Sequence, residues 1–228
     1  MSISKNIEMI RKEIRETATL VGRSFDEITL IAVSKTVGPL QVKEAIDCGI
    51  KEFGENRVQE LIEKKDKFEN EIKWHQIGRL QTNKVKYLIG KNILIHSMDR
   101  LELAEEISRQ SEKTGVVTDV LIQINVSREE TKAGIFPEEI NYFLDKLSQL
   151  KGIIVVGLMT IAPNTENLRE IRQSFGTLRK IYVDIQNERI DNNIQMKYLS
   201  MGMSHDFKIA IEEGSNMLRI GTSIFGDR

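Results

Sequence analysis

The chain alternates between short apolar runs and longer segments in which apolar residues recur every three to four positions. The short runs have the length and the β-branched content of strands. The longer segments carry charged residues between their apolar positions, which is typical of amphipathic helices. The predicted strands are residues 28–35, 51–54, 73–78, 92–98, 119–126, 153–160, 196–202 and 216–221.

Helices are predicted between these strands, and a further helix within residues 1–21 precedes the first strand. Proline near a helix start and glycine near a helix end support several of the boundaries. The leading helix has a stripe of apolar residues, made of Ile3, Ile7, Ile10, Ile14 and Leu20. The intervening helices are residues 39–48, 56–70, 82–90, 99–114, 137–150, 165–188 and 204–213.

Strands that alternate with helices predict parallel βαβ units, and eight such strands predict a closed barrel. We therefore expect an α/β fold, a single (β/α)8 TIM barrel with an additional N-terminal helix. An open doubly wound sheet is the alternative, but no G-x-G-x-x-G follows the first strand. No linker or shift in composition divides the chain, so residues 1–228 are predicted to form one domain.

Composition narrows the classes of partner. The 228 residues are 40% hydrophobic and 29% charged, as in an ordinary soluble domain, and the formal net charge is −1. This charge suggests neither nucleic acid nor an anionic membrane as a partner. No signal peptide or membrane-spanning stretch is visible, and the one cysteine, Cys48, fits a structural thiol in a reducing compartment. We expect a cytoplasmic protein.

The first strand ends in a lysine, Lys35. Side chains alternate between the two faces of a strand, so Lys35 shares its face with Val33 and Ile31. In a barrel, active groups lie at the carboxyl ends of the strands. A desolvated amine at this position would suit a Schiff base. The alternative is a strand-end lysine that extends to water.

The last two strands end in small and hydroxyl-bearing residues, SMGMS (200–204) and RIGTS (219–223). The loops after strands 7 and 8 are the usual phosphate site of this fold, which favours a phosphate here. Ser204 could instead serve only as the N-cap of the following helix. Arg219 shares a strand face with Met217, and it needs an acceptor such as a phosphate, a ring nitrogen or a neighbouring carboxylate.

Other chemistry is poorly supported. The three histidines, His75, His96 and His205, lack metal-ligand spacing, and no cysteine cluster accompanies them. No G-x-S-x-G motif is present. His75 is best interpreted as a core histidine whose hydrogen bonds are satisfied. We predict no metal site and no catalytic residue.

Six motifs together resemble the YggS/PROSC family of pyridoxal phosphate (PLP) homeostasis proteins, also called PLPBP. The resemblance covers essentially the whole chain. The motifs are AVSK (32–35), FGENRVQE (53–60), WHQIGRLQTNK (74–84), GLMTIAP (157–163), LSMGMSHDF (199–207) and RIGTSIFG (219–226).

The resemblance implies a barrel like the N-terminal domain of alanine racemase, with PLP held as a Schiff base on Lys35. It places Asn56 beside the cofactor ring and Arg219 opposite the pyridine nitrogen. The phosphate would be held by the hydroxyls and amides of Ser200, Gly202, Ser204, Gly221 and Thr222.

By the same resemblance we expect a protein that binds PLP without firm catalytic activity and that acts in vitamin B6 homeostasis, with PLP-dependent apo-enzymes as receivers. We also expect a monomer. A PLP-dependent amino-acid racemase is the alternative, but racemases of this fold type carry a second, all-β domain with a catalytic tyrosine, and we expect none beyond Arg228. A third possibility is a phosphate-binding barrel without a covalent cofactor.

Three positions are expected to stay away from the cofactor. Arg79 and Lys208 depart from the residues expected in their motifs, and neither is expected to contact the cofactor groups. Lys132, in the polar segment EETKAG, is expected to be a solvated loop lysine.

Overall fold

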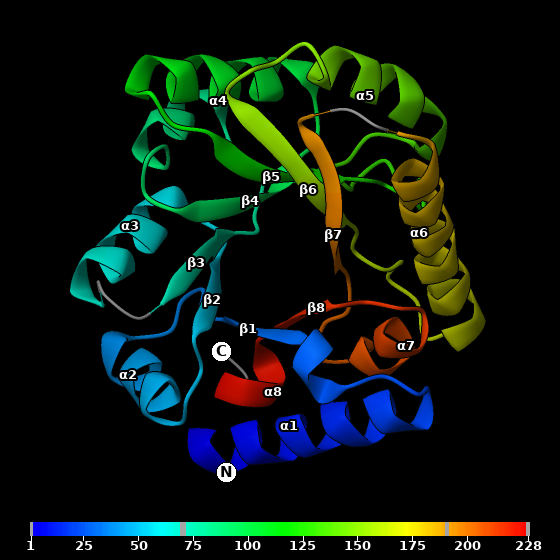
Figure 1. Ribbon diagram of the computed structural model, residues 1–228. Coiled ribbons are helices and arrows are strands. Elements are labelled where there is room, and N and C mark those ends of the chain that lie inside the picture. Colours follow the sequence, from blue (N-terminus) through cyan, green and yellow to red (C-terminus); the bar gives the residue numbers. More distant parts are fainter. Residues whose placement is uncertain (1, 69–71, 190–191, 227–228) are drawn as a thin grey trace.

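The computed structural model describes residues 2–68, 72–189 and 192–226, and its strands close into one barrel. Each strand pairs in parallel with the next, and β8 pairs with β1, which confirms the predicted (β/α)8 architecture. The strands form the inner ring of Figure 1 and the helices the outer one. The strands are β1 (Thr29–Val33), β2 (Glu52–Glu55), β3 (Lys73–Gln76), β4 (Ile93–Met98), β5 (Thr118–Gln123), β6 (Ile153–Met159), β7 (Ile194–Ser200) and β8 (Met217–Ile220).

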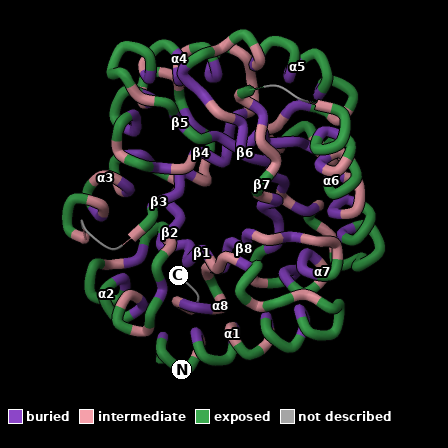
Figure 2. The backbone as a smooth tube through the Cα atoms, in the orientation of Figure 1, coloured by how far each residue is buried: buried purple, intermediate pink, exposed green. Residues whose placement is uncertain are grey.

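The helices pack their apolar faces against the outside of the barrel. In Figure 2 their outer faces are exposed, whereas the strands are mostly buried. The α-helices are α1 (Ile3–Leu20), α2 (Pro39–Asp47), α3 (Val58–Lys67), α4 (Leu101–Thr114), α5 (Ile140–Leu147), α6 (Leu168–Glu188), α7 (Phe207–Glu212) and α8 (Thr222–Phe225). The 3-10 helices are η1 (Phe25–Glu27), η2 (Thr82–Tyr87) and η3 (Pro137–Glu139).

The helix α1 confirms the predicted leading helix and packs on α2, α7 and α8. It buries Ile3, Ile7, Ile10 and Ile14 as expected, but Leu20 is 86% exposed and Ala18 is buried instead. Ala18 lies four residues after Ile14 and so continues the stripe. Leu20 lies two residues further on, where the helix has turned toward solvent.

Three other elements differ from the prediction. The segment 82–90 is a 3-10 helix over 82–87, in which Val85 and the C-cap Leu88 are buried; their spacing of three suits that geometry. The predicted helix 204–213 begins only at Phe207, because Asp206 and Phe207 both donate to the carbonyl of Met203 in a preceding turn. The short helix α8 was not predicted.

The barrel interior holds its own apolar layer, separate from the larger core between strands and helices. This layer is formed by Ile31, Leu121, Val156, Met159 and Met217. Ile31 and Met217 lie on the strand faces predicted for Lys35 and Arg219, so both faces point inward as expected. Among the described helices, none has the length and apolar character needed to cross a membrane.

Candidate cofactor site

A cavity of about 660 Å³ opens at the carboxyl ends of the strands. Segments from several strand ends contribute to it, which is the usual position of an active or binding site in this fold. Six of the eight residues predicted for the cofactor site line this cavity. They are Lys35, Asn56, Ser204, Arg219, Gly221 and Thr222.

Lys35 follows the last residues of β1 and reaches the cavity together with Val33. The alternation of faces therefore predicted its direction correctly. The expected desolvation is wrong, because Lys35 is exposed at the mouth of the cavity. An exposed position leaves the amine accessible to a ligand that enters from solvent.

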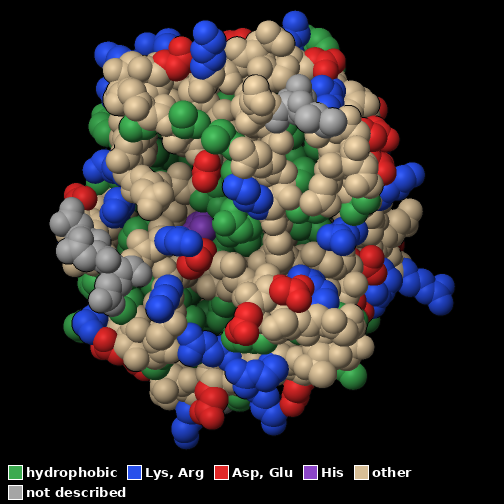
Figure 3. All heavy atoms as spheres, in the orientation of Figure 1, with side chains coloured by type: hydrophobic (Ala, Val, Ile, Leu, Met, Phe, Trp, Pro, Cys, Tyr) green, Lys and Arg blue, Asp and Glu red, His purple; other side chains and the backbone are tan. Residues whose placement is uncertain are grey.

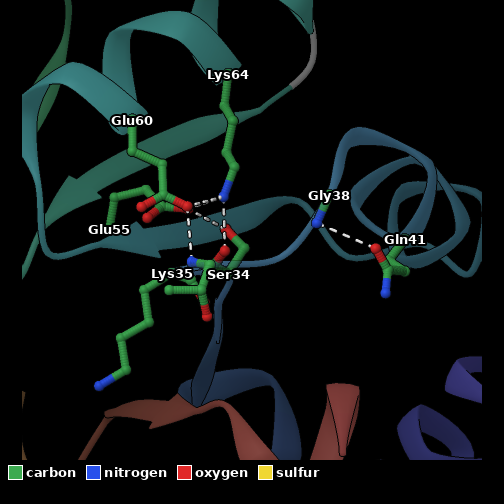
Figure 4. Close-up of polar contacts among 8 residues, drawn as sticks. Ser34, Lys35, Gly38, Gln41, Glu55, Glu60 and Lys64 are labelled. Carbon is green, nitrogen blue, oxygen red and sulfur yellow. Dashed lines mark hydrogen bonds and ion pairs between the residues drawn. The ribbon is translucent and has the colours of Figure 1, made fainter. Parts of the chain in front are cut away.

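A buried cluster of charged groups holds the backbone on both sides of Lys35 (Figure 4). On one side, the Lys64 Nζ donates to the carbonyl oxygen of Ser34 at 2.6 Å, and the Ser34 hydroxyl donates to Glu55 Oε1 at 2.6 Å. The same ammonium contacts Glu55 Oε1 at 2.8 Å and Glu60 Oε1 at 2.7 Å. Figure 4 shows the Lys35 side chain pointing away from this cluster.

On the other side of Lys35, the backbone N–H of Thr36 donates to Glu60 Oε1 at 2.7 Å. Thr36 has a φ of 62°, a conformation that is strained for a β-branched residue. The hydrogen bond to Glu60 holds this strained turn in place. Burial raises the pKa of Glu55, and its hydrogen bonds with Lys64 and Ser34 oppose that shift. The cluster therefore fixes the turn that presents Lys35.

Arg219 lies on the inner face of β8, is 4% exposed and borders the cavity. Its Nη1 donates to the Ser200 hydroxyl at 2.6 Å and its Nη2 to the carbonyl oxygen of Thr160 at 2.7 Å. Burial lowers its pKa to about 10, with the charge of Asp206 opposing the shift. No carboxylate among the described residues forms an ion pair with Arg219. A neighbouring carboxylate, one of the acceptors considered for Arg219, is therefore not its partner in this part of the chain.

Two loops bring the hydroxyl-bearing residues together at one side of the cavity. Ser204 lies in the turn before α7, and Gly221 and Thr222 begin the turn into α8. The backbone N–H of Ser223 donates to the Ser204 hydroxyl oxygen at 3.2 Å and so ties the two loops together. Because α7 begins only at Phe207, Ser204 is not its N-cap.

Ser200 and Gly202 are buried and do not belong to the lining. The Ser200 hydroxyl contacts His96 Nδ1 at 3.0 Å as well as Arg219. Gly202 has a φ of +96°, and a Cβ there would meet the Cβ of Ala210 at 2.6 Å. Glycine is thus required at this position for the close packing of the loop on α7.

Asn56 borders the cavity beside Gly78. Its carbonyl oxygen accepts a hydrogen bond from Gln76 Nε2 at 3.0 Å. A Cβ on Gly78 would lie 2.5 Å from that carbonyl oxygen, so the loops after β2 and β3 are in direct contact. This packing sets the position of Asn56 at the cavity.

Lys132 is not the solvated loop lysine that we expected. Its side chain is 19% exposed, it lines the cavity, and its Nζ donates to Glu129 Oε1 and to the carbonyl oxygen of Ala162, both at 2.6 Å. The local polar sequence resembles a surface loop, and only the contact with the loop after β6 buries the side chain.

Arg79 is mostly exposed but also lines the cavity. Lys208 lies elsewhere, in an ion pair with Glu13 of α1.

The three histidines occupy different places. His205 lines the cavity, whereas His75 and His96 are buried inside the barrel and contact each other. His75 also contacts Glu52, so the interpretation of His75 as a satisfied core histidine is correct. Within the described residues, no group of three or more histidine, cysteine, aspartate or glutamate side chains could hold a metal ion.

Comparisons with known proteins identify the family. A family model described as the N-terminal domain of alanine racemase matches residues 6–228. A pyridoxal phosphate homeostasis protein of Aquifex aeolicus is 44% identical, over 100% of this chain and 99% of that protein. Another, of Escherichia coli, is 39% identical, over 99% of this chain and 97% of that protein.

Comparison with solved structures supports the same family. PipY of Synechococcus elongatus without PLP has a TM-score of 0.87 and 32% identity, over 99% of this chain and 100% of that one. PipY with PLP bound has a TM-score of 0.80 and 34% identity, over 93% and 100%. An alanine racemase of Clostridium difficile, at 16% identity and a TM-score of 0.73, shares the fold over 98% of this chain and 57% of its own length. The chain therefore belongs to the family of pyridoxal phosphate homeostasis proteins, whose barrel matches the N-terminal domain of alanine racemase.

Proposed function

We propose that this chain binds PLP in the cavity at the carboxyl end of the barrel, with Lys35 as the covalent anchor, and serves PLP homeostasis rather than catalysis. One observation carries the proposal. An accessible amine (Lys35), a buried cation (Arg219) and hydroxyls from two adjoining loops (Ser204 and Thr222) line the same cavity.

The chemistry of these groups fits the cofactor. PLP carries an aldehyde, a ring nitrogen and a phosphate, and the cavity offers a complementary group for each. The Lys35 amine would condense with the aldehyde, forming a C=N bond and releasing one water. The hydroxyls of Ser204 and Thr222 would hydrogen-bond the phosphate, and Arg219, which can only donate, would face the ring nitrogen. Asn56 would flank the ring.

The environment of the ring nitrogen favours storage over turnover. When bound, PLP supplies an electron-withdrawing ring that stabilises a carbanion. Arg219 remains a cation at neutral pH, since its pKa is about 10, and a cation opposes protonation of a ring nitrogen beside it.

Delivery to other proteins follows from the same geometry. Lys35 is exposed, so an amine from a receiving protein can approach the C=N bond from the mouth of the cavity. The incoming amine would form a new C=N bond as the bond to Lys35 breaks and Lys35 leaves as a free amine. We propose PLP-dependent apo-enzymes as receivers. We also expect a monomer.

A visible absorption spectrum before and after borohydride tests the proposal. Added PLP should give a band of the lysine adduct, and borohydride should remove this band and fix the cofactor mass on the protein. Binding of PLP without an adduct would favour a phosphate-binding barrel. Turnover of an amino acid at about 1 per second or faster would instead support a racemase.

A further inference from the structure

A row of hydrogen-bonded side chains crosses the barrel interior beneath the cofactor cavity. Arg219 Nη1 contacts Ser200 Oγ at 2.6 Å, and Ser200 Oγ contacts His96 Nδ1 at 3.0 Å. His96 Nε2 contacts His75 Nδ1 at 3.0 Å, and His75 Nε2 contacts Glu52 Oε2 at 2.9 Å. The row therefore joins β8, β7, β4, β3 and β2, and four of its five residues are buried.

The two ends of the row lie in different cavities. Arg219 borders the cavity at the carboxyl ends of the strands. Glu52 and His75 border a second cavity, of about 380 Å³, which also includes Lys73 and Asp119 near the starts of β3 and β5. Figure 3 shows one face of the molecule, with histidine surface visible between acidic and basic side chains. The row is thus a direct polar connection between the two cavities, beside the apolar layer of the interior.

The chemistry of the two end residues decides which atom donates in each bond. Arginine has only donors and a carboxylate only acceptors, whereas a neutral imidazole has one of each. Glu52 must accept from His75 Nε2–H, so His75 Nδ1 accepts from His96 Nε2–H. His96 Nδ1 then accepts from the Ser200 hydroxyl, whose oxygen accepts from Arg219. In each of the four hydrogen bonds, the donor is therefore the residue nearer to Arg219 in the row.

An added proton would break this order. A second proton on His96 would lie on Nδ1, the atom to which the Ser200 hydroxyl donates. A second proton on His75 would put two N–H groups at the contact between His75 and His96, unless His96 reversed its tautomer. Reversal at His96 would turn its Nδ1 into a donor, and the Ser200 hydroxyl would lose its acceptor. Burial, reinforced by the proximity of His75 and Arg219, lowers the pKa of His96 well below its usual value and keeps that ring neutral.

We propose that Glu52, His75, His96 and Ser200 are positioning residues that orient Arg219 toward the cofactor through this one-directional row. Arg219 is held at two points, the Ser200 hydroxyl and the carbonyl oxygen of Thr160, and these two points fix the plane of its guanidinium group. The Thr160 contact is to backbone and does not depend on the row. The Ser200 contact does, because the orientation of its hydroxyl is set by His96.

Packing alone does not explain why these buried positions are polar. Buried polar groups cost desolvation free energy, and an apolar filling of the same volume stabilises a core at least as well. The neighbouring interior is filled in that way, by Ile31, Leu121 and Val156 among others. The row ends on Arg219, the one buried guanidinium among the described residues that line the cavity. The orientation that the row gives to this group explains why the row is polar.

Nitrogen-15 NMR of histidine in the protein without cofactor tests the direction of the row. Both His75 and His96 should be neutral with the proton on Nε2 at pH 7.5. In a His75→Phe variant, His96 loses its acceptor and should move its proton to Nδ1. In His75→Gln the amide can accept from His96 and donate to Glu52, so the His96 tautomer should be kept. A His96 that carries its proton on Nδ1, or on both nitrogens, in the unmodified protein would overturn the direction assigned here.

The positioning role rests on the proposed function and is tested by PLP titration of the same variants. His75→Phe should raise the PLP dissociation constant about tenfold, whereas His75→Gln should stay within about twofold of the unmodified protein. Lys73→Met is the matched control, because Lys73 neighbours Glu52 at 3.6 Å but lies outside the row. It should leave both the tautomers and the dissociation constant unchanged.

Thermal unfolding of each variant distinguishes loss of the row from loss of the fold. Unchanged PLP affinity in a folded His75→Phe protein would overturn the positioning role, and so would equal losses in His75→Phe and His75→Gln. If the unmodified protein fails to bind PLP, the proposed function is wrong, while the tautomers still decide whether the row has the assigned direction.

Discussion

The ammonium group of Lys64 lies 2.6 Å from the carbonyl oxygen of Ser34, the residue that immediately precedes Lys35. Lys64 belongs to α3 and its side chain is only 7% exposed. It is therefore a buried cation whose partners are two carboxylates and one backbone carbonyl. Lys35, the proposed anchor, is thus presented by a turn that a second lysine, Lys64, holds through its backbone contact.

Replacing Lys64 by Met should destabilise the protein by about 3–5 kcal/mol, because the buried carboxylate of Glu55 would lose its cation. Denaturant unfolding measures this loss. Lys67→Met, on the exposed part of the same helix, should change stability by less than about 0.5 kcal/mol. Adding Glu55→Gln to Lys64→Met should recover part of the loss. If Lys64→Met costs no more than Lys67→Met, the cluster does not stabilise the turn.

Lys35→Ala should abolish the covalent adduct while the protein stays folded, because Lys35 is exposed and its removal leaves the cluster behind it intact. Weak non-covalent PLP binding should survive through the other lining residues. Mass spectrometry after borohydride reduction measures the adduct. Lys132→Ala is the control, since Lys132 is the second lysine in the lining, and it should retain the adduct. Cofactor mass on Lys132 in the Lys35→Ala protein would refute Lys35 as the anchor.

The two serines of the predicted phosphate site should behave differently. Ser204 lines the cavity, so Ser204→Ala should weaken binding of PLP by about 1.5–3 kcal/mol and leave binding of unphosphorylated pyridoxal nearly unchanged. Ser200 is buried beside Arg219, so Ser200→Ala should weaken the binding of PLP and of pyridoxal to the same extent. Titration with the two ligands measures the difference. A selective loss of PLP binding in Ser200→Ala would place the phosphate near Ser200 after all.

Exchange of the α-hydrogen of L-alanine in deuterated water should be slow in the PLP-loaded protein. Arg219 has only donors and cannot accept a hydrogen bond from a protonated ring nitrogen, so the ring nitrogen beside it should remain unprotonated and the ring should stabilise a carbanion poorly. Proton NMR follows the exchange. Arg219→Glu should increase the rate, whereas Arg219→Lys, which keeps the positive charge, should not. Exchange at about 1 per second or faster in the unmodified protein would contradict the non-catalytic function.

Local patterns were sufficient to predict the barrel and the direction of its key side chains. The alternation of strand faces placed Lys35 and Arg219 inward, and the hydroxyl-rich ends of strands 7 and 8 indicated loops that the structure joins through Ser204 and Ser223. Ser200 was harder to place. It ends a strand in the same motif as Ser204, but the side chains that contact it come from β4 and β8.

The sequence by itself determined the fold class, the inward faces of the strands and the end of the barrel at which the proposed cofactor residues lie, because each depends on periodicity along one segment or on strand order. Tertiary structure alone decided which distant groups meet. His96 and Ser200 are 104 residues apart on strands that do not pair, and they meet because the closed sheet turns both side chains into one narrow interior. No local pattern records such a contact, and for the same reason the burial of Lys132 and Lys64 depends on segments that only the folded barrel brings beside them.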